Sequence, residues 1–169
     1  MRNYKIAFTG PESSGKTTLA LQVAAKWKGL YIDEFAREYL AEKSTYVQSD
    51  LDAIAKGQQE KWNVQTPLLI ADTEMTVLCI WSQYKYESIS NCIRQCFLEQ
   101  DFDILFLCKP DIPWQFDPLR ENPENRDELF DLYHSFLKEN KQKFVVVEGD
   151  EVNRCRIVDD ELRNLITVK

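Results

Sequence analysis

Apolar residues gather along the chain in five short runs, each followed by stretches in which apolar positions recur every three or four residues. Short runs bounded by glycine, proline or charged residues predict β-strands, here at residues 4–10, 30–32, 68–71, 103–108 and 143–149. The wider spacing predicts amphipathic helices, here at residues 20–27, 33–43, 49–65, 74–84, 88–99, 129–137 and 158–166. Strands and helices therefore alternate along the sequence.

This alternation predicts a three-layer α/β fold. Strands separated by helices pair in parallel through right-handed crossovers, so helices cover both faces of the sheet. We expect a single domain over residues 1–169 with a five-stranded parallel sheet, because a chain of this length builds one core. Ligands bind beyond the carboxyl ends of such strands, which are residues 10–17, 33–38, 72–74, 109–126 and 148–153.

The composition is that of a folded domain and restricts its partners. Hydrophobic residues make up 44% of the chain and charged residues 29%, and the net charge is −7. Affinity for nucleic acids and anionic lipids comes largely from basic side chains. No apolar run in the sequence approaches the ~20 residues that span a bilayer. We therefore expect neither nucleic-acid nor membrane partners, and the composition leaves the oligomeric state open.

The cysteines bear on the cellular compartment. There are five, an odd number, and the first residues lead directly into a predicted strand instead of a signal peptide. We therefore expect a reducing cytoplasm. Cys92 and Cys96 share a helix face, but no CxxC pair occurs and the one histidine, His134, is distant in sequence. This pattern disfavours a zinc site.

Residues 10–17, GPESSGKT, match the phosphate-binding pattern G-x-x-x-x-G-K-[ST] between a predicted strand and a predicted helix. Backbone N–H groups of such a loop surround phosphate oxygens, and the helix N-terminus adds partial positive charge. We expect Lys16 to bridge the β- and γ-phosphates of ATP in catalysis and the Thr17 hydroxyl to coordinate Mg²⁺. The predicted nucleotide-binding residues are Gly10, Glu12, Ser13, Ser14, Gly15, Lys16, Thr17 and Thr18. The alternative is a tight strand-to-helix turn with a similar composition.

Three further segments follow this loop: DEFAREY (33–39), LLIADTEMT (68–76) and DIPWQFDPLRENPENRDELF (111–130). In this order they resemble the kinase domain of the NadR family, which phosphorylates nicotinamide riboside with ATP. The most specific parts are E-[YF]-[AG]-R-[DE]-Y and P-W-x-x-D-x-L-R. The resemblance covers nearly the whole chain and implies a P-loop NTPase fold with a lid loop and a place in NAD biosynthesis.

The resemblance is limited to the kinase part of those proteins. Full NadR proteins also carry a DNA-binding module and a nucleotidylyl-transferase domain, and this sequence begins at the first strand of the kinase. Glu74 ends an Asp-Thr-Glu triplet where relatives commonly have D-T-D. Pro118 precedes the Leu-Arg pair where relatives often have glycine.

Two carboxylates, Asp33 and Glu34, follow the second predicted strand. From this position a carboxylate can hydrogen-bond an acceptor hydroxyl and take its proton as the bond to phosphorus forms. We predict Glu34 as the catalytic base and as a substrate-binding residue, with Asp33 as the neighbouring candidate. The alternative for both is to cap the following helix. The resemblance adds Arg37 as a substrate-binding residue, which would otherwise belong to a solvated helix face.

Asp72 ends the third predicted strand, where a carboxylate holds Mg²⁺ directly or through water and borders the substrate. Its alternative role is to cap the helix that begins near Glu74. Arg120 and Arg126 fall in the proline-marked segment after the fourth strand. We predict that they close over the triphosphate as catalytic lid residues and stabilise charge on the transferred group. The alternative is an ordinary surface loop.

For the other candidate residues of the site, the sequence indicates a possible contact but no catalytic role. Trp114 could stack on a flat cationic ring such as nicotinamide, with ordinary packing as the equal alternative. Asp117 could bind a ribose hydroxyl. His134 lies among aromatic residues of a predicted helix and is expected to be structural. Residues 148–153, after the last strand, are where such folds contact adenine.

Together these features predict an ATP- and Mg²⁺-dependent kinase of the 5′-hydroxyl of nicotinamide riboside. Two alternatives stay open. The acceptor could be another nucleoside or metabolite, or the chain could be a P-loop ATPase or nucleotide switch that acts on a protein partner. A hydrolase needs a group that positions water, so a carboxylate and an aromatic side chain beside the acceptor position favour the kinase.

Overall fold

The computed structural model describes residues 2–117 and 124–167 of the chain. Pro118 and the predicted catalytic residue Arg120 lie outside these described residues. The strands are β1 (Tyr4–Thr9), β2 (Leu30–Ile32), β3 (Leu68–Ala71), β4 (Ile104–Cys108) and β5 (Phe144–Val147). The helices are α1 (Lys16–Trp27), α2 (Phe35–Leu40), α3 (Gln48–Lys61), α4 (Met75–Tyr86), α5 (Asn91–Glu99), α6 (Arg126–Glu139) and α7 (Glu151–Thr167).

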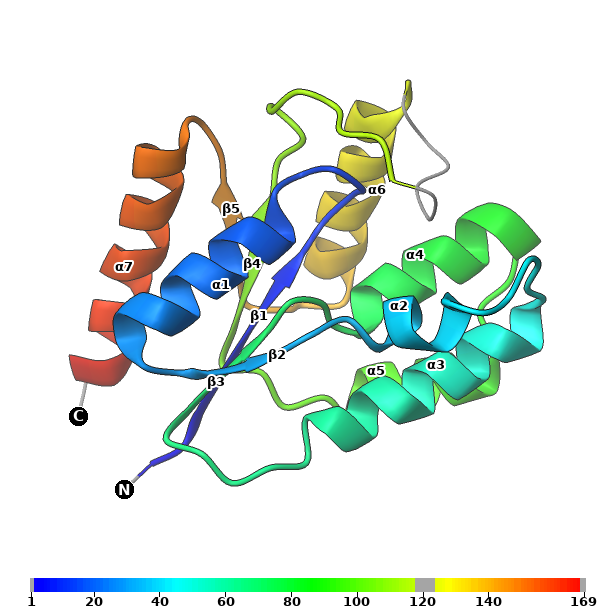
Figure 1. The fold of residues 1–169 in the computed structure, drawn as a ribbon, viewed down its shortest axis with the longest axis horizontal. Helices are drawn as coiled ribbons and strands as arrows, with labels where there is room; N and C mark the ends of the chain where they lie inside the picture. The colour runs from blue at the N-terminus through cyan, green and yellow to red at the C-terminus, as the bar shows by residue number, and fades with distance from the viewer. Residues whose placement is uncertain (1, 118–123, 168–169) are drawn as a thin grey trace.

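The strands form one parallel sheet in the order β2-β3-β1-β4-β5, which confirms the predicted fold class (Figure 1). β1 lies at the centre, where Ala7 pairs with Ala71 on one side and Leu105 on the other. Parallel register brings the carboxyl ends of all five strands to one edge of the sheet. The loops that carry the predicted site residues therefore converge there.

Two buried apolar clusters hold the layers together, one on each face of the sheet. α1 and α7 pack on one face, with Val23 and Val158 against Phe8 and Phe106. The helices α2 to α6 contribute to the cluster on the other face, around Met75, Ile93 and other side chains. Figure 1 shows this division, with α1 and α7 on one side and α2 to α5 on the other. Side chains of β1, β3 and β4 alternate between the clusters, which explains their almost continuous apolar sequences.

The helix ends differ in places from those predicted. α3 begins at Gln48, one residue before the predicted helix, and the Asp50 carboxylate accepts the backbone N–H of Val47 at 2.8 Å from within the first turn. α2 is shorter than the predicted helix over 33–43. His134 packs edge-on against Phe144, with ring centroids 5.3 Å apart, as expected of a structural residue. Within the described ranges, no helix combines the length and apolarity needed to cross a membrane.

Candidate active site

The phosphate loop requires glycine at both glycine positions of its pattern, for different reasons. Gly10 has φ 128°, and a Cβ there would lie 2.6 Å from the carbonyl oxygen of Cys108 at the end of β4. Gly15 has φ 83° and immediately precedes α1, whose N-terminus therefore faces the loop. Ser13 also adopts a positive φ, 51°. Left-handed residues turn successive N–H groups toward one concave side, the geometry of an anion-binding loop.

The loop is closed by its own side chains. Lys16 extends along its inner side, where Nζ donates to the carbonyl oxygens of Gly10 at 2.8 Å and Pro11 at 2.7 Å. The buried Ser14 hydroxyl donates to the same Pro11 oxygen at 2.8 Å. The ammonium of Lys16 thus lies in the space that the loop encloses, which is where a phosphate clamp must act.

Two arginines hold the outer side of the loop. Arg126, predicted as a lid residue, is instead the first residue of α6, and its Nη1 donates to the carbonyl oxygens of Ser13 at 2.9 Å and Ile112 at 3.0 Å. Arg154 of α7 donates from Nη1 to the carbonyl oxygen of Ser14 at 2.8 Å. Each guanidinium group therefore donates a hydrogen bond to a backbone carbonyl oxygen of the phosphate loop.

Arg154 was not predicted, yet it connects three loops at the edge of the sheet. It is 5% exposed, and besides Ser14 it donates to the carbonyl oxygens of Lys109 and Gly149 and pairs with the carboxylate of Asp111. Asp111 also accepts the N–H of Gly149 at 2.7 Å. Buried arginines of this kind need several acceptors to offset desolvation. The sequence signal available was one arginine on the apolar face of an otherwise amphipathic helix.

Asp72 lies next to the phosphate loop, because β3 pairs with β1. Its Oδ2 accepts hydrogen bonds from the hydroxyls of Thr17 at 2.7 Å and Tyr31 at 3.0 Å. Its Oδ1 is buried without a hydrogen-bond partner in the described structure. Burial and the neighbouring Asp72 charge together raise the pKa of Tyr31, so the phenol stays a donor to this carboxylate.

This pair of oxygen ligands suits Mg²⁺. Mg²⁺ takes one or two protein oxygens and completes its shell with waters and phosphates. Thr17 and Asp72 would hold it, with the unpaired Oδ1 of Asp72 available as an acceptor for it or for its water. No cluster of three or more His, Cys, Asp or Glu side chains that could hold a metal occurs among the described residues. The alternative role of Asp72 as a helix cap is wrong, because Glu74 caps α4 by accepting the Thr76 N–H at 2.8 Å.

Glu34 is the carboxylate that faces the phosphate loop from α2. It forms an ion pair with Nε of Arg37 at 3.3 Å, and Arg37 also donates to Asp117 at 2.9 Å. Burial is the main cause that raises the pKa of Glu34, and the charges of Asp72 and Asp117 add to it. Lys16 and Arg37 oppose this rise. A carboxylate with a raised pKa beside a phosphate site is suited to general-base catalysis.

Glu34 occupies the N-cap position of α2, but its side chain makes no capping hydrogen bond. The alternative role of the Glu34 carboxylate as a helix cap is therefore wrong, and the carboxylate faces the site. Asp33 points elsewhere: it is exposed and pairs with Lys61 of α3 at 2.8 Å. The structure thus separates the two adjacent carboxylates and brings only Glu34 to the phosphate loop.

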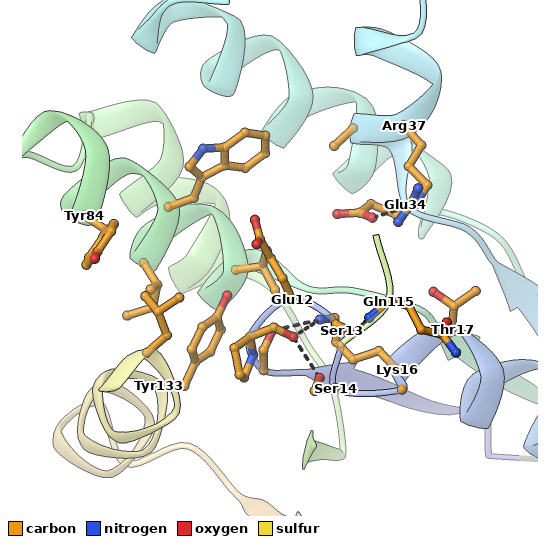
Figure 2. A pocket seen from close by; sticks show the side chains of 18 of the residues that line it. Glu12, Ser13, Ser14, Lys16, Thr17, Glu34, Arg37, Tyr84, Gln115 and Tyr133 are labelled. Carbon is orange, nitrogen blue, oxygen red and sulfur yellow. Dashed lines mark hydrogen bonds and ion pairs between the residues drawn. The ribbon is translucent and has the colours of Figure 1, made fainter. Parts of the chain in front are cut away.

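A single cavity of about 350 Å³ runs from the phosphate loop to a wall of aromatic and aliphatic side chains. Figure 2 shows Lys16 and Thr17 at the loop, Glu34 and Arg37 from α2, and Tyr84 and Tyr133 from α4 and α6 around it. All eight predicted nucleotide-binding residues line this cavity. The wall consists of Leu40, Val77, Ile80, Trp81, Tyr84, Leu129 and Tyr133.

The aromatic side chains at the cavity are not the one predicted. Trp114 does not line it; the Arg126 guanidinium lies over the Trp114 ring, 5.6 Å from its centroid. Asp117 is likewise absent from the lining and pairs with Arg37. Trp81 and Tyr84 of α4 and Tyr133 of α6 line the cavity instead. The spacing of Trp81 and Tyr84 indicates an amphipathic helix, which by itself cannot distinguish a core-facing residue from a cavity-facing one.

The loop after β5 is organised around its backbone. Gly149 has φ 89°, and Asn153 donates to the carbonyl oxygen of Glu148 at 2.9 Å. The Asp150 carboxylate accepts the N–H of Asn153 at 2.8 Å within the first turn of α7. Through Arg154 this loop is tied to the phosphate loop. Its predicted contact with adenine stays a prediction.

A family model described as an AAA domain matches residues 5–154. Among solved structures, the chain is similar to a NadR protein in complex with NR, at 22% identity and a TM-score of 0.84, over 99% of this chain and 52% of that one. A second NadR structure, in complex with NAD and AMP-PNP, has 18% identity and a TM-score of 0.79, over 99% and 50%. Deoxyadenosine kinase from M. mycoides with bound dATP has 16% identity and a TM-score of 0.63, over 95% and 100%.

These similarities confirm the predicted resemblance at the level of the fold, which is shared with P-loop kinases. The chain spans about half the length of the NadR chains that it matches. No curated protein sequence matches it.

Proposed function

Because the chain belongs to the AAA domain family and its phosphate loop opens into an acceptor-sized cavity, we propose that it is an ATP-dependent kinase of a nucleoside-like hydroxyl. One observation carries this proposal. The same cavity is lined by Lys16 and Thr17 at one end, by the Glu34 carboxylate beside them, and by aromatic side chains at the other. A nucleotide hydrolase needs a group that positions water at the γ-phosphate, and an aromatic wall beside that position is suited instead to an organic acceptor.

In the proposed reaction, the acceptor hydroxyl lies between Glu34 and the γ-phosphate. Its oxygen forms a bond to phosphorus while the bond from phosphorus to the β–γ bridging oxygen breaks, and ADP leaves. The hydroxyl proton passes to Glu34. Lys16 and the N-terminus of α1 stabilise the phosphate charge. Mg²⁺ held by Thr17 and Asp72 would neutralise charge on the β- and γ-phosphate oxygens.

We propose nicotinamide riboside as the acceptor, with its cationic ring against Trp81, Tyr84 or Tyr133. A cation over an aromatic face is attracted by ~0.5–2 kcal/mol, depending on desolvation. Acidic side chains at the cavity, Glu12 and Glu34, add to this preference. Burial raises the pKa of Tyr133, so its hydroxyl stays protonated and can donate to the acceptor. The resemblance to NadR kinase motifs points to the same substrate and to NAD biosynthesis, and the odd number of cysteines points to a reducing cytoplasm.

The test is a coupled assay of ADP release across a panel of acceptors, with a control that contains no acceptor. The panel contains nicotinamide riboside, its reduced form with an uncharged ring, nicotinic acid riboside, adenosine and uridine. We expect stimulation by nicotinamide riboside and a higher KM for the uncharged analogue. Stimulation by another nucleoside alone would reassign the acceptor. If no acceptor stimulates ADP release, the nucleotide switch acting on a protein replaces the kinase.

A further inference from the structure

Gln58, a buried residue of α3, holds the backbone on both sides of Glu34. Its Oε1 accepts the N–H of Phe35 at 2.7 Å, and its Nε2 donates to the carbonyl oxygen of Asp33 at 3.2 Å. The side chain is 1% exposed. The two peptide groups that flank Glu34 are therefore both hydrogen-bonded to the side-chain amide of Gln58.

The neighbours of Gln58 on α3 hold the same segment. A Cβ at Gly57 would lie 2.1 Å from the ring of Phe35, so glycine is what allows this ring to lie against α3. Nζ of Lys61 donates to Asp33 at 2.8 Å and to Glu38 at 2.9 Å. Gly57, Gln58 and Lys61 of α3 thus all contact the start of α2, against the Phe35 ring, through an amide and through an ammonium group.

These contacts supply an acceptor for one N–H at the start of α2 without using the side chain of Glu34. The first N–H groups of a helix need acceptors, and a side chain at the N-cap ordinarily supplies one. At α2 the amide of Gln58 accepts the first of these N–H groups, that of Phe35. Glu34 and Gln58 also line one small cavity together. The carboxylate of Glu34 makes no capping bond and lines the larger cavity at the phosphate loop.

We infer that Gln58 is a positioning residue that sets the backbone of Glu34 so that its carboxylate meets the acceptor hydroxyl. This inference rests on the proposed kinase function. A group that must reach a proton within hydrogen-bond distance is sensitive to small shifts, and misplacement by about 1 Å can cost ~10²-fold in rate. If Gln58 only linked α2 to α3, its replacement would lower the stability of the protein but would not slow acceptor phosphorylation selectively.

The experiment compares Gln58→Met with Gln59→Met. Methionine keeps the length of glutamine but makes neither bond. Gln59 is the next residue of the same helix, and its amide donates to Glu99 of α5 at 3.0 Å, away from the site. For Gln58→Met we expect kcat for acceptor phosphorylation to fall ~10–100-fold, with the KM for ATP and the ATP hydrolysis without acceptor within about 2-fold of the unmodified protein. Gln59→Met should leave all three unchanged.

Hydrogen exchange at the Phe35 amide gives a readout that needs no acceptor. It should accelerate in Gln58→Met and stay slow in Gln59→Met, since only the former loses the acceptor of this N–H. Normal kcat in Gln58→Met despite faster exchange would overturn the inference and leave the kinase intact. Equal losses of acceptor phosphorylation and of background hydrolysis would also overturn it. Failure of every acceptor with the unmodified protein would instead remove the kinase proposal and this inference with it.

If Gln58→Met does not fold, Gln58→Asn takes its place. Asparagine stays polar but is one methylene shorter, so it cannot reach both peptide groups. The same selective loss of kcat is expected, with circular dichroism and thermal unfolding to establish the fold. A folded Gln58→Asn with unchanged kcat would contradict the inference.

Discussion

The two ends of the cavity are built in different ways. The phosphate end is a continuous segment, residues 10–18, whose backbone forms the site and whose carbonyl groups are bonded by Arg126 and the buried Arg154. The acceptor end is assembled from side chains of α2, α4 and α6, which come from separate parts of the chain. Backbone N–H groups at the first end suit a phosphate group of any nucleotide, whereas the second end depends on which side chains meet. We therefore expect changes at the first to affect every activity, and changes at the second to affect only the acceptor reaction.

The sharpest test of this division is Glu34→Gln. If Glu34 takes the proton of the acceptor, acceptor phosphorylation should fall by ~10²–10⁴, the usual contribution of a positioned general base. ATP hydrolysis without acceptor should change far less, because water reaches the γ-phosphate without this carboxylate. Both rates are measured by coupled ADP release.

The matched control is Asp33→Asn, one residue earlier, where the carboxylate is exposed and pairs with Lys61. It should leave acceptor phosphorylation within about 2-fold. An equal loss of both activities in Glu34→Gln, or no loss in either, would remove Glu34 as the base. A large loss in Asp33→Asn alone would transfer that role to Asp33.

Arg154→Met should affect the phosphate end through stability. Removing the guanidinium leaves the buried carbonyl oxygen of Ser14, the carbonyl oxygen of Gly149 and the Asp111 carboxylate without this donor. A buried acceptor left without its donor commonly costs ~1–3 kcal/mol, so we expect a loss of about this size. Urea unfolding measures this loss. The control is Arg163→Met on the same helix, which pairs with Asp160 at the exposed surface and should lie within about 0.5 kcal/mol of the unmodified protein.

Lys16→Ala should lower both acceptor phosphorylation and background hydrolysis by ~10²–10³, the cost of losing one electrostatic contact to the transition state. The fold should be retained, because the Lys16 ammonium contacts only backbone carbonyls of the loop. Exposed Lys56→Ala on α3 is the control and should change neither rate. Near-normal turnover of Lys16→Ala would contradict the phosphate-site assignment.

Trp81→Leu should raise the KM for the acceptor up to ~10-fold, in line with the ~0.5–2 kcal/mol of a cation against an aromatic face. The KM for ATP should not change, since Trp81 belongs to the acceptor end. Trp114→Leu distinguishes this assignment from the sequence-based one, because Trp114 does not line the cavity. An acceptor KM that responds to Trp114→Leu and not to Trp81→Leu would return the stacking role to Trp114.

The pH dependence should show the smallest effect. Burial raises the pKa of Glu34 above the ordinary glutamate value of 4.5. A general base acts in its ionised form, so kcat for the acceptor should fall as the pH decreases through this raised pKa. The decline should therefore begin at higher pH than an ordinary glutamate would give, and it should be absent from Glu34→Gln. A profile that is the same in both proteins would show that the decline belongs to another group.

The strands, the sheet and the phosphate loop were predictable because their signals are local. Apolar runs, helical spacing and the Gly10 to Thr17 pattern each lie within a short stretch, and the parallel register follows from their order. The sequence favoured Glu34 over Asp33 as the base, but the surroundings of the two side chains were not predictable, since both are carboxylates after the same strand. Contacts with α3 distinguish the two carboxylates. Gln58 accepts the N–H of Phe35, 23 positions earlier, and Lys61 pairs with Asp33, 28 positions earlier.

The sequence by itself determined that this chain forms a parallel α/β fold and carries a phosphate loop, because backbone conformation depends on residues next to one another. Only the tertiary structure decided that Arg154 holds that loop from 140 positions away, and that Trp81 rather than Trp114 lines the cavity. A helical stripe of aromatic residues has the same spacing whether it packs into a core or lines a cavity. Which of the two it does depends on the helices opposite, and here α2, α4 and α6 leave a space between them that side chains do not fill.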